Sequence, residues 1–189
     1  MMRGINKQTI FEDVEDRERF LATIERYKEI CKYEVYGYCL MNNHVHLLLK
    51  ETEEPITKAI KRICSSYVYW YNRKYERCGH LFQERYKSET VEDDAYLLTV
   101  LRYIHQNPVK SNVTKTAKDY KWSSYNEYIS KPGIVDTGFV LQILSTDMKE
   151  AIDSLIKYTN EQNKDKCLDN DEKIRLSDNE VKKYFTELV

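Results

Sequence analysis

The sequence predicts an α+β fold, in which helices pack on one side of an antiparallel sheet. Three observations lead to this prediction. Segments with the apolar spacing of helices alternate with short strand-like segments, in the order helix, hairpin, helix, strand, helix. The two central strand segments are separated by a two-residue turn, which requires antiparallel pairing. The 189 residues are enough for one domain with a buried core and an appendage.

The first helix follows a loop over residues 4–11 and is expected to run from about Val14 to Cys31. Apolar residues recur there at helical spacing, which indicates one face that packs on the core. Asp13 is a suitable N-cap, because its short carboxylate can accept hydrogen bonds from the first backbone N–H groups of the helix. One strand could precede this loop.

The central hairpin is predicted from the strands Glu34–Met41 and His44–Lys50. Asn42 and Asn43 lie between them and suit a tight turn, because asparagine tolerates a positive φ angle.

The second helix is expected to begin at Pro55, which is favoured at the first helical position, and to end near Glu76. After a glycine, residues His80–Val91 are predicted to form a third strand. A further helix is expected to begin at Asp93 or Asp94. It should stop before Pro108, because the residue that precedes a proline is pushed out of helical geometry.

The last third of the chain carries weaker signals. Phe139–Leu144 and Met148–Tyr158 indicate helices that pack on the main body. Residues 160–171 are predicted to be a polar, exposed linker. Ser177 and Glu180 have the spacing of a capping box ahead of a short final helix.

Composition excludes several classes of protein. No stretch of about 18 uninterrupted apolar residues occurs, so a membrane span is not expected. The start of the chain lacks the apolar region of a secretory signal, and a cytoplasmic protein is expected. The 5 cysteines are scattered, which argues against a disulfide framework and a cysteine-based zinc site. Cys39 and Cys64 lie among apolar residues and are expected to be reduced core thiols.

Charge and tyrosine are unevenly distributed. Residues 55–91 carry eight Lys or Arg residues against three Glu, although the whole chain has a net charge of −1. Several of the 16 tyrosines fall within this basic stretch. Aromatic residues among basic ones can stack on unpaired bases, but the same residues can equally pack the core and its edges.

Two histidines form the strongest local signal. His44 and His46 are expected to project from the same face of their strand, because side chains alternate across a strand. Two neutral imidazoles at this spacing can share a metal ion. The alternative is that both merely form local hydrogen bonds on a half-buried strand.

A second signal lies on the helix before Pro108. Tyr103 and Asn107 are four residues apart and therefore share one helical face. The tyrosine ring could lie at the edge of the core with its hydroxyl free, or it could be an ordinary boundary tyrosine.

Five motifs occur in order along the first two thirds of the chain. They are Arg3-Gly4-Ile5-Asn6, the segment from Tyr38 through Asn42-Asn43-His44-Val45-His46 to Leu49, Gly79-His80-Leu81-Phe82-Gln83-Glu84-Arg85-Tyr86, Tyr103-Ile104-His105-Gln106-Asn107-Pro108-Val109-Lys110 and Trp122-Ser123-Ser124-Tyr125. Together they resemble the single-tyrosine HUH transposases, especially the REP-associated tyrosine transposases. Five ordered motifs are far more specific than one.

The resemblance implies a ferredoxin-like fold and a site for Mg²⁺ or Mn²⁺. His44 and His46 would bind the metal, Asn107 would complete the site, and Tyr103 would be the nucleophile. The expected activity is nicking and rejoining of single-stranded DNA through a covalent 5′-phosphotyrosine. The catalytic domain would span residues 1–130, and residues 131–189 would form a helical C-terminal extension with a polar linker.

The resemblance also implies recognition of DNA hairpins next to single-stranded guide sequences, by a monomer or a homodimer. Such contacts to phosphates would be salt-dependent and largely independent of sequence. The candidate residues for DNA contact are Arg3, Arg62, Trp70, Tyr71, Arg73, Lys74, Arg77, Arg85, Lys87 and Lys110.

In the family a full strand precedes the Arg-Gly element and pairs beside the histidine strand. Only Met1 and Met2 precede Arg3, so a shortened strand is expected. Two alternatives stay open: a domesticated or inactive hairpin-binding protein of the same fold, and a metal-dependent hydrolase of another class. The hydrolase would use water, so its activity would survive Tyr103→Phe.

Overall fold

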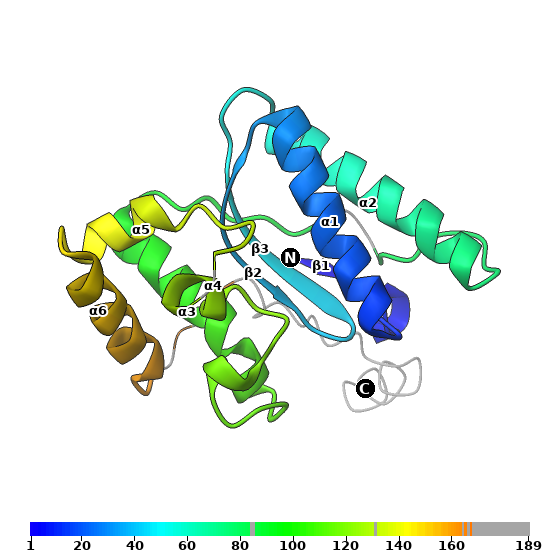
Figure 1. The fold of residues 1–189 in the computed structure, drawn as a ribbon. Helices are drawn as coiled ribbons and strands as arrows, with labels where there is room; N and C mark the ends of the chain where they lie inside the picture. The colour runs from blue at the N-terminus through cyan, green and yellow to red at the C-terminus, as the bar shows by residue number, and fades with distance from the viewer. Residues whose placement is uncertain (84–85, 131, 164, 166, 168–189) are drawn as a thin grey trace, which may run out of the picture.

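The computed structural model describes residues 1–83, 86–130, 132–163, 165 and 167. A central sheet separates two groups of helices (Figure 1). On one face lie α1 (Val14–Cys31) and α2 (Ile56–Lys74), and on the other lies α3 (Asp94–Lys110). The predicted α+β class is confirmed, but the prediction that helices cover one side of the sheet is wrong.

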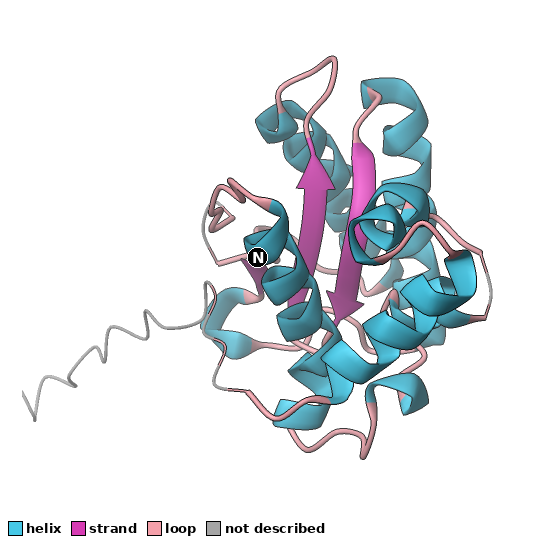
Figure 2. Cartoon of the chain, turned by 90° about the vertical axis from the view of Figure 1, so that its left-hand side faces the viewer, coloured by secondary structure: helices cyan, strands magenta, loops and turns pink. Residues whose placement is uncertain are grey.

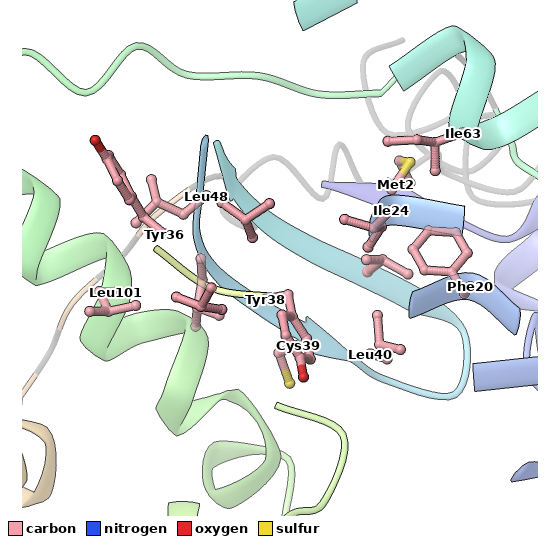
Figure 3. Packing of buried hydrophobic residues seen from close by; sticks show 14 of the residues in the cluster. Met2, Phe20, Ile24, Tyr36, Tyr38, Cys39, Leu40, Leu48, Ile63 and Leu101 are labelled. Carbon is pink, nitrogen blue, oxygen red and sulfur yellow. The ribbon is translucent and has the colours of Figure 1, made fainter. Parts of the chain in front are cut away.

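Helices cover both faces because the strand β2 (Glu34–Leu40) is apolar on both. All its residues from Val35 to Leu40 are buried, and such a continuous apolar run is typical of strands enclosed on two sides. Figure 3 shows Phe20 and Ile24 on one side of the sheet and Leu101 on the other. Gly37 lets α3 approach closely, since a Cβ atom there would lie 2.7 Å from a methyl carbon of Leu101.

The sheet places the histidine strand in its middle. β2 pairs antiparallel with β3 (His44–Lys50), and the two strands run in opposite directions in Figure 2. β1 (Met2–Arg3) pairs with the other edge of β3, which gives the order β1-β3-β2 within the described residues. The first strand is therefore short, as expected, and lies beside the strand that carries the histidines.

The hairpin turn lies where it was predicted, but the reason given for it is wrong. Positive φ angles do not occur at Asn42 or Asn43; among the described residues they fall at Asn6, Lys7, Lys32, Glu76, Asn112 and Gly79. Instead, Asn42 Oδ1 accepts a hydrogen bond of 2.6 Å from Arg17, and Asn43 Nδ2 donates one of 3.3 Å to the Lys7 carbonyl. Both asparagines stabilise the turn through their side chains.

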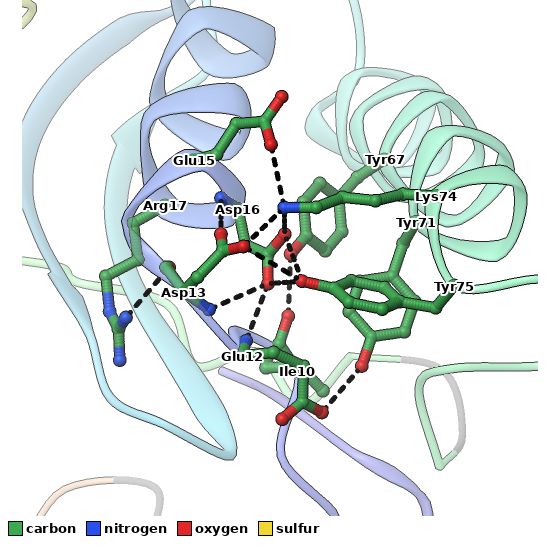
Figure 4. A network of polar contacts seen from close by, with 10 residues as sticks. All are labelled: Ile10, Glu12, Asp13, Glu15, Asp16, Arg17, Tyr67, Tyr71, Lys74 and Tyr75. Carbon is green, nitrogen blue, oxygen red and sulfur yellow. Dashed lines mark hydrogen bonds and ion pairs between the residues drawn. The ribbon is translucent and has the colours of Figure 1, made fainter.

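A polar network joins α1 to α2 (Figure 4). Asp13 caps α1 as predicted and forms a capping box with Asp16, whose side chain is fully buried. Lys74 Nζ lies 2.7 Å from Asp13, 2.9 Å from Glu15 and 2.9 Å from Asp16. The Tyr75 hydroxyl also donates to Asp16, at 2.9 Å.

The predicted third strand over His80–Val91 is wrong for the residues that are described. Those residues form a loop beside the N-terminal segment, with one isolated bridge between Gly4 and Phe82. Single backbone bonds run from Gln83 to Arg3 and from Lys87 to Met1. A continuous ladder does not form because β1 offers only two residues as partners.

The helix α3 does not stop before Pro108, so the predicted end is wrong. It continues to Lys110, and its cap residue Ser111 donates to the Asn107 carbonyl. A proline removes one intrahelical hydrogen bond, but here it lies in the last turn, where few bonds remain to be lost. Consequently Tyr103 and Asn107 both lie within regular helix.

Beyond α4 (Tyr125–Ile129), the helices α5 (Thr137–Leu144) and α6 (Met148–Asn160) confirm the predicted helical segments. Of the predicted exposed linker, residues 160–162 are exposed, whereas Asn163, Asp165 and Cys167 are partly or fully buried. Arg102 binds Asp165 through two nitrogens, at 2.7 and 3.1 Å, and Cys167 is buried. The predicted final helix at Ser177 lies outside the described residues.

The end of α6 and the residues after it contact the outer face of α3. Arg102 contacts Asp165, Gln106 donates to the Thr159 carbonyl at 2.5 Å, and Lys110 donates to Asn163 at 3.1 Å. Three successive turns of α3 are therefore held by Thr159, Asn163 and Asp165.

The search for membrane spans, made over the described residues, finds no helix with the length and apolarity to cross a bilayer. All five cysteines carry free thiols. Cys39 is fully buried, and Cys64 is partly buried against the core.

Candidate active site

The two histidines of β3 lie side by side on one face of the strand. Their ring centroids are 5.0 Å apart, with the ring planes at 86°. His46 is 3% exposed, whereas His44 is partly exposed. Val45 between them points into the opposite core and is fully buried, as strand alternation requires.

The helix α3 brings a third polar side chain to both rings, across more than 60 residues of sequence. Asn107 Oδ1 lies 3.3 Å from His44 Nε2, and Asn107 Nδ2 lies 3.2 Å from His46 Nε2. The Nε2 atoms of both imidazoles therefore converge on one amide.

Tyr103 lies one helical turn before Asn107. Its ring centroid is 5.6 Å from that of His46, at an interplanar angle of 80°. Lys110 Nζ lies 5.2 Å from the centre of the tyrosine ring. Tyr103 is 7% exposed, and together with His46 it lines a cavity of 590 Å³.

The cavity extends from these two residues along β3, beneath the loop at residues 86–93. Its walls are mainly apolar and include Leu48, Val100 and Tyr36. Five carboxylates and two lysines also line it: Glu51, Glu89, Glu92, Asp93, Asp94, Lys50 and Lys87.

Burial keeps the imidazole of His46 neutral. It lowers the pKa of His46 well below the usual histidine value, and the nearby positive charges of His44, the chain's amino terminus and Arg3 lower it further. A neutral imidazole is the form that can act as a metal ligand. Burial also lowers the pKa of Lys110, partly offset by the charge of Asp165.

The donor set is chemically suited to a divalent cation. The described residues contain no group of three or more His, Cys, Asp or Glu side chains that could hold a metal ion. The candidate set is instead two imidazole nitrogens and one amide oxygen. Amide oxygens suit Mg²⁺ and Mn²⁺, and imidazole suits many transition metals, so the mixed set fits Mn²⁺ better than Mg²⁺.

The residues predicted to contact DNA are not all at this site. Arg3 pairs opposite His44 in the sheet, and Lys110 lies against Tyr103. Lys87 lines the cavity, whereas Arg85 lies outside the described residues.

The candidates on α2 lie on the opposite face of the sheet from α3 (Figure 1). Arg62 binds Glu54 at 2.5 Å and Cys31 at 2.9 Å, and Arg77 binds Gln8 at 3.2 Å. Tyr71 is buried and donates to Glu12, while Trp70 is partly buried beside Tyr67. Arg73 is exposed, and Lys74 belongs to the carboxylate network of Figure 4.

One residue of this site was missed from the sequence. Asn43 Oδ1 lies 2.7 Å from His44 Nδ1, on the side of the ring away from Asn107. Its position directly before His44 was the available signal, but it was interpreted only as a turn residue.

Comparisons with known proteins identify the family and a similar fold. The family model described as "Transposase IS200 like" matches residues 1–107. A Haemophilus influenzae protein named as a REP-associated tyrosine transposase is 27% identical over 116 residues, which cover 53% of this chain. The match covers 65% of that relative, which is less than two thirds of its length.

A solved structure described as a REP-associated tyrosine transposase bound to a REP hairpin has a similar fold. The TM-score is 0.59, the sequence identity is 14%, and the match covers 72% of this chain and 79% of the other. At this identity the likeness shows the shared fold.

Proposed function

Because the chain belongs to the IS200-like transposase family, we propose that it is a metal-dependent single-stranded DNA endonuclease and strand transferase. It would act on hairpin-flanked DNA through a covalent 5′-phosphotyrosine. The observation that carries this proposal is the convergence of Tyr103 and Asn107 on the two histidines of β3.

His44, His46 and Asn107 are the residues that would hold Mg²⁺ or Mn²⁺. A divalent ion bound there supplies Lewis acid chemistry, because it withdraws charge from the oxygens of the scissile phosphate. The Nε2 atoms of both histidines contact the Asn107 amide, at 3.3 and 3.2 Å.

Tyr103 is the proposed nucleophile. Its phenolic oxygen forms a bond to phosphorus while the bond from phosphorus to the 3′ oxygen breaks, and the released 3′ oxygen takes up a proton. An unperturbed phenol has a pKa of about 10, so ionisation at neutral pH needs help. The ammonium of Lys110, 5.2 Å from the ring centre, is the group that we propose supplies positive charge beside the attacking phenol. The reverse attack by a 3′ hydroxyl rejoins DNA without a separate energy source.

The lining of the cavity supports single-stranded DNA as the substrate. Its apolar and aromatic walls suit the flat face of an unpaired base, and Tyr103 stands at one end. The carboxylates in its lining disfavour phosphates there. Arg3 and Lys110 lie near the histidines and are better placed to contact the phosphates of the DNA backbone.

The test is denaturing electrophoresis after incubation with Mn²⁺ and a labelled oligonucleotide that carries a hairpin and a single-stranded flank. Label on the 3′ side of the break should travel with the protein, and Tyr103→Phe should abolish this band by at least about 1000-fold. Tyr96→Phe is the matched control on the same helix and should retain it. Hairpin binding by Tyr103→Phe should stay within about twofold, because the ring remains.

Other outcomes identify the alternatives. Cleavage that survives Tyr103→Phe would indicate a water nucleophile and a hydrolase. Hairpin binding by the unaltered protein without any cleavage or adduct would indicate a DNA-binding protein of the same fold.

A further inference from the structure

Two adjacent residues near the N-terminus hold a conformation that side chains disfavour. Asn6 has a φ of 50° and Lys7 a φ of 60°, in a short 3-10 turn. Strained backbone of this kind persists only where surrounding contacts determine it, and it is found often at functional sites. The contacts of this turn therefore indicate which neighbouring group the strained conformation holds in place.

The turn holds the connection between β2 and β3. Gly4 N–H donates to the Asn43 carbonyl at 2.9 Å, and Ile10 N–H donates to the Asn42 carbonyl at 2.8 Å. Gly4 is required because a Cβ atom there would collide with the Gln8 carbonyl oxygen. The left-handed residue Lys7 then presents its own carbonyl oxygen to the side chain of Asn43, 3.3 Å from Nδ2.

This contact decides which way the Asn43 amide points. A carbonyl oxygen can only accept, so the amide nitrogen must face Lys7 and the amide oxygen must face His44. Oδ1 lies 2.7 Å from His44 Nδ1. Because the amide oxygen is also only an acceptor, His44 Nδ1 must carry a hydrogen and donate it.

The other nitrogen of His44 is then left with a lone pair in the neutral ring. It faces the Asn107 amide, whose Oδ1 lies 3.3 Å from His44 Nε2 and whose Nδ2 lies 3.2 Å from His46 Nε2. With hydrogen on Nδ1, the neutral His44 ring therefore carries its lone pair on the nitrogen that faces Asn107.

We propose that Asn43 is a positioning residue, which holds His44 in the tautomer with hydrogen on Nδ1 and so keeps the lone pair of the neutral ring on Nε2. The strained turn at Asn6 and Lys7 serves to orient the Asn43 amide. This inference rests on the function proposed above, since the tautomer of His44 matters only if a metal binds. Partners that fix the tautomer of a metal-binding histidine typically contribute 10- to 100-fold to metal affinity.

The direct test is ¹⁵N NMR of the histidine side chains in the full chain without metal or DNA, at a pH where a titration shows both rings neutral. Wild-type His44 should carry hydrogen on Nδ1. Asn43→Ala should shift it toward the Nε2–H tautomer, which free histidine prefers. Asn43→Asp keeps an acceptor beside Nδ1 and should preserve the wild-type tautomer.

Asn42→Ala is the matched control. Its side chain holds the same turn through Arg17 at 2.6 Å but does not act on the Nδ1 atom of His44, so the tautomer should not change. Calorimetric titration with Mn²⁺ should then show an affinity lower by about 10- to 100-fold for Asn43→Ala, and close to wild type for Asn42→Ala.

The inference is overturned if wild-type His44 carries hydrogen on Nε2, or if Asn43→Ala leaves the tautomer unchanged while circular dichroism shows a folded protein. If Asn43→Ala fails to fold, Asn43→Asp decides: a change of tautomer in that variant contradicts the inference. Failure of the wild-type protein to bind Mn²⁺ would refute the proposed metal chemistry. This outcome can be distinguished from failure of the tautomer inference, because the tautomer is measured without metal.

Discussion

Two polar clusters in this molecule differ in how their charges and hydrogen bonds are satisfied. In the network between α1 and α2, the buried carboxylate of Asp16 meets Lys74, Tyr75 and backbone donors of its own capping box. In the cluster between β3 and α3, the Asn107 amide contacts the Nε2 atoms of His44 and His46, and Asn43 contacts the other side of the His44 ring. The first cluster pairs its charges within the protein and stabilises the fold. The second is the cluster for which we propose a bound cation.

The largest expected effect of a substitution in the second cluster is on metal binding. His44→Ala should lower Mn²⁺ affinity and adduct formation by at least about 100-fold, because one of three candidate ligands is lost. Thermal stability without metal should change little, since His44 is partly exposed. His80→Ala is the control, because His80 is exposed and does not line the cavity. Equal effects of both variants would contradict the assignment.

The first cluster should respond in the opposite way. Asp16→Ala should lower the free energy of unfolding by about 3 kcal/mol, since it removes a buried carboxylate with several charge-assisted hydrogen bonds. Urea unfolding measures this loss. Glu15→Ala removes another carboxylate that contacts Lys74, but its side chain is 68% exposed, so the loss should stay below about 0.5 kcal/mol. Adduct formed per folded molecule should not change in either variant.

A third buried polar group, His105 on α3, is expected to make the stability of the fold depend on pH. Burial lowers the pKa of His105 to about 3. Unfolding frees this histidine to bind a proton below its ordinary pKa of about 6.5, so the stability it contributes is present above that pH and is lost as the pH falls.

Between pH 7 and pH 5 this loss should be about 2 kcal/mol. His105→Gln keeps a polar atom near the Ser124 hydroxyl, which lies 2.9 Å from His105 Nε2, but does not titrate. The variant should therefore lose about 2 kcal/mol less than wild type over this range. Urea unfolding at both pH values provides the measurement, and parallel losses in the two proteins would assign the sensitivity to other groups.

The smallest expected effect concerns DNA contacts on α2. Arg73 is exposed, and Arg73→Ala should weaken hairpin binding by less than about threefold while reducing the salt dependence of the affinity by about one unit of slope. Fluorescence anisotropy at several salt concentrations provides the measurement. An unchanged slope would remove Arg73 from the predicted interface.

Local features of the fold were predictable from the sequence where a single element determines them. The Asp13 cap, the central hairpin and the spacing of His44 and His46 follow from short-range rules. Errors arose where tertiary contacts override those rules. Pro108 lies within helix, and the segment after Gly79 has too few partners to form a strand.

For the candidate site, helical spacing placed Tyr103 and Asn107 on one face. Their approach to β3 could be expected only from the family resemblance or seen in the structure, because no local rule links residues about 60 positions apart. The orientation of α2 could not be predicted either. The same aromatic spacing fits a helix face that binds DNA and a helix face that packs on the core. In the structure Tyr71 is buried. The roles assigned to the site residues stay predictions.

The contacts along the outer face of α3 have a consequence for truncated variants of this protein. Arg102, Gln106 and Lys110 are held by the end of α6 and the residues after it, and Lys110 in turn lies over the ring of Tyr103. A frameshift or premature stop after residue 130 would thus leave every candidate ligand in the polypeptide and yet remove the outer support of the helix that bears the proposed nucleophile. A mutation in the gene far downstream of the codons for the candidate site should therefore still affect the position of the Tyr103 hydroxyl.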